Sequence, residues 1–464
     1  MSTIGLKAEM EALRTFLPEV VQHIETVAPY GSVHLTSQGG QMLYVDNLQE
    51  SVNEVPPTQG MVVSAFDGQT MRERAMSGFE RDQLMQGMKQ LLSEGEFGTN
   101  GRIDTGPKRS GDFQTAMEID PDTLDTREKL AYLRELRERA NAVDKRVVNV
   151  RVRQNVLREQ DVFCSRTANL AQHVLRVTAT VMVMVAGETG IQFDYVIKSG
   201  TGGWELLTFT DEEIERAVQN ALKLLTADRI PAGEYTIVTA PPVSGVICHE
   251  SFGHGVETDM FLKERARAKD YVGKVVGSPL VNIYDDPSLP GATGSYFFDH
   301  EGVLARPTHI VEDGVFRGGI TDLYSATRLG IRRTPNGRRQ DFSRKVYPRM
   351  SNTYFGKGSM SLEEMLSGVD QGYYLGKVSS GMEDPKGWGI QVSCPYAFEI
   401  RSGELTDHMF AAVGITGYVP DVFQSISALS NDLEFSGGTC GKGHKENVKV
   451  SDGGPHMLMK ARLG

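Results

Sequence analysis

The sequence predicts an α+β protein, with a mixed helix and antiparallel-sheet N-terminal part followed by a β-rich C-terminal domain that carries a metal-motif helix. Three observations predict this class. Several N-terminal segments place apolar residues at helical spacing, others alternate apolar and polar residues as strands do, and turn signals divide the chain after residue 229 into short apolar runs. Because 464 residues exceed one ordinary core, we expect two or three domains.

Residues 1–110 are predicted to form an N-terminal α/β region. A helix is expected over residues 5–27, where apolar side chains lie near helical spacing, and another over residues 77–93. The glycine-rich, polar stretch 95–111 is expected to be a loop. Three short strand-like segments lie between the two helices, at residues 33–36, 41–45 and 60–66.

Residues 111–228 are predicted to form a central antiparallel sheet with flanking helices. One helix is expected over residues 126–143, and a second begins at a cap, Thr210 or Asp211. The segments between them alternate as a meander with one buried face does, at residues 146–153, 155–159, 161–164, 174–186 and 191–197. The most favoured domain boundary follows at residues 227–233.

Residues 229–464 are predicted to form the β-rich C-terminal domain. Its first apolar run, residues 235–240, leads through the break Pro241-Pro242 into a short helix. A strand that leads through a proline break into a helix is a rigid place to mount chemical groups.

The composition excludes several classes of protein. The net charge is −11 with mixed signs and no basic cluster, which argues against a general binder of nucleic acid or anionic membranes. The longest apolar run, residues 177–186, is far short of the roughly 20 residues that cross a bilayer. The N-terminus lacks a basic start followed by an apolar core, so we expect a cytoplasmic protein.

The most informative motif is the run from Cys248 to His254, which places His249, Glu250 and His254 within six residues. Imidazole is a standard zinc ligand, and a neighbouring glutamate is a general base for water whose pKa the metal lowers. The run therefore indicates a zinc hydrolase site. The alternative is a chance grouping on a solvated helix, but the chain has only 10 histidines.

The spacing of the two histidines predicts a local distortion. They lie five residues apart, and on a regular α-helix their side chains would diverge by about 140°. One small ion cannot bridge such a pair. We therefore expect either a π-bulge near Phe252 and Gly253 or a helix that ends between the histidines.

The four cysteines, at positions 164, 248, 394 and 440, are too few and too widely spaced for a disulfide scaffold. Cys440 lies in a glycine-rich loop, 436–443, and is a candidate third zinc ligand. The alternative is a small thiol in a tight turn. Cys248 is expected to pack behind the motif, because adjacent side chains point in different directions and cannot easily share a proton.

The motif and the Cys440 loop together resemble the TldD/PmbA family of metallopeptidase-like proteins, also named modulators of DNA gyrase. The resemblance covers most of residues 233–456 and is weak in the N-terminal half. The further blocks that carry it are residues 281–286, 294–302, 336–339, 348–353 and 437–443. Because the chain keeps the histidine motif, it resembles the TldD-type subunit more than the PmbA-type (TldE) partner.

The resemblance implies a zinc ion held by His249, His254 and Cys440, with Glu250 as the general base. It implies cleavage of unfolded or leader-type peptides, and a homodimer or a heterodimer with a TldE/PmbA-type paralogue. A non-catalytic regulatory protein of the gyrase-modulator type is the alternative. The intact water-activating carboxylate favours the enzyme.

Four further residues are candidates for substrate binding. Arg338, Arg339 and Arg349 carry the planar fork that suits carboxylate or carbonyl oxygens, although surface ion pairing is the alternative for each. His444, four residues after Cys440, is a candidate donor to the oxyanion of the tetrahedral intermediate, with a supporting role behind the metal ligands as its alternative.

Overall fold

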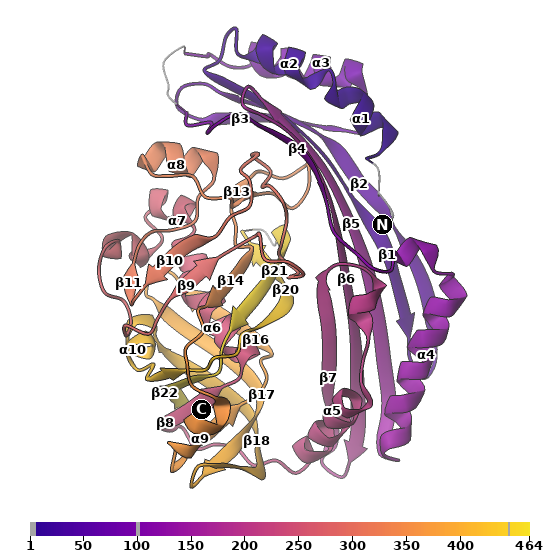
Figure 1. Ribbon diagram of the computed structural model, residues 1–464, viewed down its shortest axis with the longest axis vertical. Helices are drawn as coiled ribbons and strands as arrows, with labels where there is room; N and C mark the ends of the chain where they lie inside the picture. The colour runs from indigo at the N-terminus through magenta and orange to yellow at the C-terminus, as the bar shows by residue number, and fades with distance from the viewer. Residues whose placement is uncertain (1–5, 99–102, 444–445) are drawn as a thin grey trace.

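A computed structural model describes residues 6–98, 103–443 and 446–464 of the chain. Two sheet-containing halves lie side by side, and the α+β class predicted from the sequence is confirmed (Figure 1). Among the described residues, no helix is both long and apolar enough to cross a bilayer.

The N-terminal half is built on one seven-stranded sheet, called here the long sheet. Its order is β3-β2-β1-β5-β6-β4, and β7 also pairs with β6. The strands are β1 (Tyr30–Val45), β2 (Glu50–Phe66), β3 (Met71–Ser77), β4 (Arg109–Gln114), β5 (Val147–Ser165), β6 (Ala168–Gly187) and β7 (Gly190–Thr201). The helices are α1 (Ala8–Arg14), α2 (Leu17–Ile24), α3 (Arg81–Ser93), α4 (Thr126–Val143) and α5 (Asp211–Leu224), and the short 3₁₀ turns are η1 (Pro121–Thr123) and η2 (Trp204–Leu207).

All five helices of this half cover one face of the long sheet. Helices α1 to α3 bury apolar side chains against one end of that face, and α4 and α5 do so at the other end (Figure 1). Strand residues on the opposite face are largely polar, among them His34, Asp161, Gln172 and Arg176, and they are buried against the C-terminal half. The expectation of a sheet with one buried face is therefore wrong around these residues, because the second half of the chain covers them. It holds at the other end of β5, where Arg151 and Arg153 on the same face are exposed.

Three of the differences between the predicted and the observed helices and strands have a clear outcome. The helix expected over residues 5–27 is two helices, because Pro18 has no N–H to continue α1 and instead occupies the first turn of α2. The short strands expected over residues 33–45 and 146–164 are the continuous strands β1 and β5. The loop expected over residues 95–111 gives way at Arg109 to β4, which runs parallel to β6.

Other predictions of local structure hold. Helix α4 has the predicted bounds, and α5 begins at Thr210, whose side chain accepts the N–H of Glu213 in a capping box. The division into residues 1–110, 111–228 and 229–464 stays a prediction. Strands β1 and β5, on either side of residue 110, pair in the same sheet.

The C-terminal half contains two larger sheets and a small hairpin. In the first sheet, β15, β8, β22, β18 and β17 form a closed ring, because β15 pairs with both β8 and β17. Its strands, with β16 and β19, are β8 (Gly233–Thr239), β15 (Gln371–Leu375), β16 (Ser380–Asp384), β17 (Gly389–Arg401), β18 (Glu404–Tyr418), β19 (Ala428–Leu429) and β22 (Met457–Leu463).

The second sheet has six strands in the order β11-β10-β9-β14-β21-β20. The strands are β9 (Ile283–Asp285), β10 (Thr308–Glu312), β11 (Val315–Phe316), β14 (Asn352–Phe355), β20 (Glu434–Lys442) and β21 (Glu446–Gly454), and β12 (Gly337–Arg338) pairs with β13 (Tyr347–Pro348). The helices are α6 (Pro241–Phe252), α7 (Thr258–Leu262), α8 (Leu323–Leu329), α9 (Leu362–Ser367) and α10 (Val419–Gln424), with 3₁₀ turns η3 (His254–Val256) and η4 (Arg267–Tyr271).

Helix α6 lies between these two sheets and positions the motif. It contacts β20, β21 and β14 of the six-stranded sheet and β16 and β17 of the ring sheet. Its apolar residues Val243, Ile247, Cys248 and Phe252 are fully buried in the main core. Because both sheets hold the helix, its last turn is fixed where β20 and β16 end.

Candidate metal centre

The helix that carries the motif ends between the two histidines. Helix α6 stops at Phe252, the N–H of Gly253 donates to the carbonyl of His249 at 3.1 Å, and η3 begins at His254. The π-bulge that we considered is therefore wrong, and the second expectation, a helix end, holds. A Cβ on residue 253 would lie 2.0 Å from Met350 Sδ and 2.3 Å from the His249 carbonyl, so only glycine fits there.

This helix end brings His249, His254 and Cys440 together. One donor atom from each lies within 4.8 Å of the other two. The Cys440 Sγ is 3.4 Å from His254 Nε2, and the two imidazole centroids are 5.0 Å apart. A tetrahedral zinc ion with ordinary bond lengths separates its nitrogen and sulfur ligands by about 3.6 Å. The three side chains therefore fit a metal ion with little movement.

Each histidine has its second nitrogen held by a carboxylate. His249 Nδ1 lies 2.6 Å from Asp452 Oδ1, and His254 Nδ1 lies 3.3 Å from Glu257 Oε2. Such carboxylate partners fix the tautomer of a metal-binding histidine and leave the other nitrogen free for the metal. The Nε2 atom of each histidine is therefore the one available to a metal.

The three candidate ligands are electrostatically coupled. Burial opposes the charged imidazoles, but the Cys440 thiolate and Glu257 raise the pKa of His254 to about 10. Burial likewise opposes the thiolate, yet His254 and His249 lower the pKa of Cys440 to about 5. The other thiols behave differently, since burial raises the pKa values of Cys164 and Cys394 to about 12. Of the four buried cysteines, only Cys440 is therefore stabilised in the thiolate form.

Two glutamates lie beside the cluster. Glu250 and Glu383 each place a carboxylate oxygen within 4.8 Å of a His254 nitrogen and of each other. Burial and the hydrogen bond with Glu250, against the attraction of His254, raise the pKa of Glu383 to about 7. The pair can share one proton.

Glu383 was not predicted from the sequence. It lies on β16, 133 positions after Glu250, and only the fold brings the two together. Gly381 permits the approach, because a Cβ there would lie 2.5 Å from Glu250 Cγ. The one available signal was the Gly381-Met-Glu383 spacing, which places the glycine and the carboxylate on the same face of a strand.

A cavity of about 340 Å³ adjoins the cluster. His254, Glu257 and Glu383 form one part of its wall, and Lys442 and Gly441 form another. Lys442 Nζ lies 3.0 Å from Glu257 and 2.6 Å from Asp259, so its charge is already paired. The cavity is large enough for a short stretch of peptide.

The arginines considered for substrate binding are all buried, and none is a surface ion-pairing residue. Arg349 donates to the Cys440 carbonyl at 2.8 Å and lies 3.4 Å from its Sγ, directly behind the thiolate. Arg338 and Arg339 face a different cavity. His444 lies outside the described residues. Substrate contacts by these four residues stay predictions.

A second group of possible ligands, His34, Asp161 and His300, also gathers donor atoms within 4.8 Å. The backbone N–H of Arg339 donates to His300 Nδ1 at 2.9 Å. A neutral imidazole that accepts at Nδ1 carries its proton on Nε2 and offers no lone pair to a metal. We therefore interpret this group as a buried hydrogen-bonded cluster.

Comparison with known proteins shows the family of the chain. Residues 232–462 match the family model of the PmbA/TldA metallopeptidase C-terminal domain, and residues 119–228 match that of the central domain. The chain belongs to the PmbA/TldD metallopeptidase family. A metalloprotease from Archaeoglobus fulgidus is 30% identical over 401 residues, which are 86% of this chain and 89% of that protein.

Other family members are similar over shorter stretches. A metalloprotease from Methanothermobacter thermautotrophicus is 34% identical over 61% of this chain, and a zinc metalloprotease TldD homologue from Saccharolobus solfataricus is 32% identical over 53%. These alignments cover 62% and 54% of the two relatives, less than two thirds of their lengths.

Solved structures of the family share the fold. A Thermotoga maritima protein described as a modulator of a DNA gyrase superposes with a TM-score of 0.76 at 18% identity, covering 96% of this chain and all of the other. TldE from Thermococcus kodakarensis superposes with a TM-score of 0.73 at 17% identity, covering 98% of this chain and all of the other. At these identities the likeness concerns the fold alone.

Proposed function

We propose that this family member is a zinc-dependent peptidase that cleaves unfolded or leader-type peptides with an activated water. The observation that carries the proposal is the convergence of His249, His254 and Cys440, with both histidine Nδ1 atoms held by carboxylates. Relatives named metalloproteases, one of them a zinc metalloprotease, support it.

The residues have distinct roles in this proposal. His249, His254 and Cys440 hold the zinc, which supplies the Lewis acidity that polarises a peptide carbonyl and makes water easier to deprotonate. Glu250 takes the proton from the attacking water and returns it to the leaving amine. Glu383 shares a proton with Glu250. When Glu383 holds this proton, Glu250 is left ionised and can act as the base. Arg349 holds the Cys440 thiolate in place from behind.

The proposal extends to the surroundings of the site. The peptide lies in the 340 Å³ cavity beside His254. We infer a partner chain as well, either a second copy or a TldE/PmbA-type paralogue, because the fold of TldE matches this chain over nearly its whole length. We expect the protein to act in the cytoplasm.

The test uses the purified full-length chain, alone and with a co-expressed TldE-type paralogue. The zinc content of both preparations is measured by inductively coupled plasma mass spectrometry. Both are also incubated with a mixture of unfolded peptides, and the products are identified by peptide mass spectrometry. About one zinc per chain at the cluster and new peptide termini would support the proposal. Full zinc occupancy without cleavage, in both preparations, would favour the regulatory role instead.

A further inference from the structure

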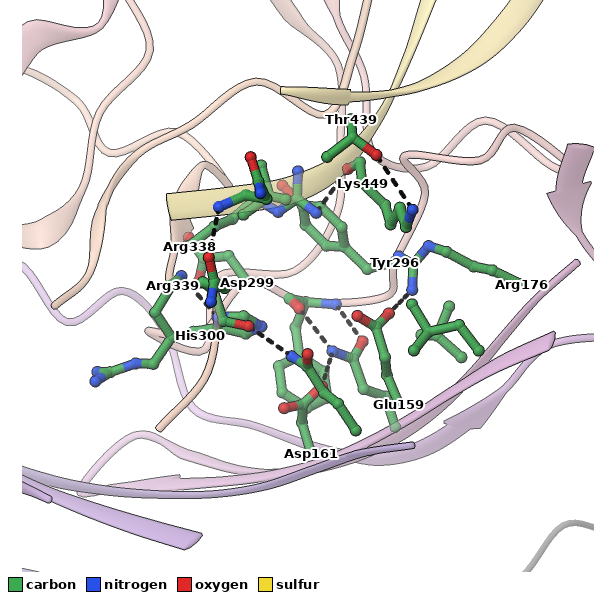
Figure 2. Close-up of a pocket in the computed structure, with 18 residues that line it drawn as sticks. Glu159, Asp161, Arg176, Tyr296, Asp299, His300, Arg338, Arg339, Thr439 and Lys449 are labelled. Carbon is green, nitrogen blue, oxygen red and sulfur yellow. Dashed lines mark hydrogen bonds and ion pairs between the residues drawn. The ribbon is translucent and has the colours of Figure 1, made fainter. Parts of the chain in front are cut away.

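A second cavity, of about 260 Å³, lies between the polar face of the long sheet and the C-terminal half (Figure 2). The hairpin of β20 and β21 contributes Thr439 and Lys449 to its wall. Neighbouring residues of a strand point to opposite faces, so Thr439 faces this cavity while Cys440 faces the metal cluster. The cavity is thus separate from the peptide cavity beside His254.

Three cationic side chains converge on one part of this cavity. Arg176 comes from β6, Arg338 from β12 and Lys449 from β21, and the two arginines are 4% and 6% exposed. In Figure 2 the Lys449 ammonium and the Arg176 guanidinium lie near each other on one side of the cavity. Lys449 Nζ donates to Thr439 Oγ1 at 3.1 Å, which uses one of its three protons.

The negative charge around these cations does not balance them. Glu159 is in contact with Arg176. Within residues 6–98, 103–443 and 446–464, no carboxylate oxygen lies within 4.0 Å of a nitrogen of Arg338 or Lys449. Arg338 instead donates to backbone carbonyls, including that of Lys449 at 2.8 Å, and stacks on Tyr296. Arg338 is buried and Lys449 is half-buried. A buried cation without a carboxylate partner is costly unless an anion joins it.

The other two acidic side chains of the cavity wall are already engaged. Asp161 accepts from Gln172 at 3.0 Å and lies 2.9 Å from His34 Nε2. Asp299 accepts three backbone N–H groups, the closest that of Val303 at 2.8 Å. These contacts hold both carboxylates away from the cationic side.

The pKa values of two of the three cations, Arg176 and Lys449, show that positive charge around the cavity is not fully neutralised. Burial, with a contribution from Arg338, lowers the pKa of Arg176 to about 9. Burial and Arg176 lower the pKa of Lys449. Arg338 therefore disfavours the charge of Arg176, and Arg176 disfavours that of Lys449, so an anion between them would relieve the repulsion.

We propose that this cavity binds a small ligand through an oxyanion, a carboxylate or phosphate group, held by Arg176, Arg338 and Lys449. The proposal does not depend on the peptidase activity. The fork of an arginine and the point charge of a lysine both suit such oxyanions. Gln38 and His300 also line the cavity and offer polar groups to the rest of the ligand.

Isothermal titration calorimetry of the full-length chain in a low-chloride buffer tests the proposal, with inorganic phosphate and succinate as separate probes. The Cys440→Ser variant is titrated in parallel, so that binding to a metal ion is not counted. We expect one of the probes to bind, and the one that does identifies the preferred oxyanion. Lys449→Met should weaken binding by about tenfold or more, since a charged hydrogen bond is lost.

Two further variants make the result decisive. Glu159→Gln should tighten binding severalfold, because it removes the carboxylate in contact with Arg176, and a misfolded variant would not show this gain. Lys89→Met, at an exposed position on α3, is the matched control and should leave affinity unchanged. The proposal is overturned if neither probe binds at millimolar concentration, or if Lys449→Met binds as tightly as the unaltered chain.

Discussion

At the scale of single residues, substitution of Glu250 tests the catalytic role and substitution of Asp452 tests the binding of the metal. Glu250 lies beside the cluster without being one of its three convergent ligands, and Asp452 touches only the far nitrogen of His249. Their substitutions should therefore affect different measurements.

Glu250→Gln should lower peptide turnover by a factor of about 10² to 10⁴ and leave zinc bound, because the amide keeps the shape and loses the base. Zinc content and turnover are measured on one preparation. Glu363→Gln, exposed on α9, is the control and should change neither. Unchanged turnover in Glu250→Gln would remove this residue from the mechanism, and loss of zinc would make it a ligand.

Asp452→Asn should weaken zinc affinity by about 10- to 100-fold, the usual effect of removing a carboxylate behind a metal-binding histidine. Competition with a chromogenic chelator measures the affinity. Asp82→Asn, exposed on α3, should behave as the unaltered chain does. Equal zinc affinity in Asp452→Asn would show that the carboxylate does not orient His249.

At the scale of the elements, the end of α6 decides the geometry of the site. Its position follows from Gly253, which fits against Met350 where a larger residue does not. Two glycines lie near this helix end, and only one of them is tightly enclosed. A Cβ on Gly255 would come no nearer than 3.8 Å to another atom, Trp388 Nε1.

Gly253→Ala should displace His254, lower zinc occupancy and reduce the free energy of unfolding by about 1 to 3 kcal/mol, the usual cost of overpacking a core. Gly255→Ala, two residues away, should keep both zinc and stability. Metal analysis and urea denaturation of the two variants check this pair. If both variants behave alike, the enclosure of Gly253 does not position the cluster.

The elements also show how far the sequence could be interpreted. Local signals were enough to predict the bounds of α4 from its apolar spacing and the start of α5 from its cap. The spacing of His249 and His254 was enough to expect an interrupted helix. The approach of Glu383 to Glu250 and that of Asp452 to His249 could not be anticipated, because each joins residues more than a hundred positions apart and depends on strand order. The polar face of the long sheet was misjudged for the same reason.

At the scale of the whole molecule, burial of the polar face of the long sheet ties the two halves together. His34 and His300 come from different halves, and their rings stack with centroids 4.9 Å apart. Burial lowers the pKa values of both histidines, so both are neutral in the folded protein. As the pH falls, the unfolded chain therefore binds protons at these positions near a pH of about 6.5, whereas the folded chain binds them only at lower pH.

The free energy of unfolding should therefore fall as the pH drops below about 6.5, by up to about 1.4 kcal/mol per pH unit for each of the two histidines. Urea denaturation of the Cys440→Ser chain at several pH values measures the slope without bound zinc. Adding His34→Gln should make the slope shallower, whereas His23→Gln, at an exposed position, should not. Equal slopes in the two would contradict this role for His34.

The hairpin of β20 and β21 has one further consequence. From adjacent positions on one strand, Thr439 faces the cationic cavity and Cys440 faces the metal cluster. Any ligand that shifts this strand changes the free energy of both occupants, and thermodynamic reciprocity then applies. The factor by which an oxyanion alters the dissociation constant of zinc must equal the factor by which zinc alters that of the oxyanion. If both ligands bind, a shift of this one strand would couple the zinc occupancy to the oxyanion concentration.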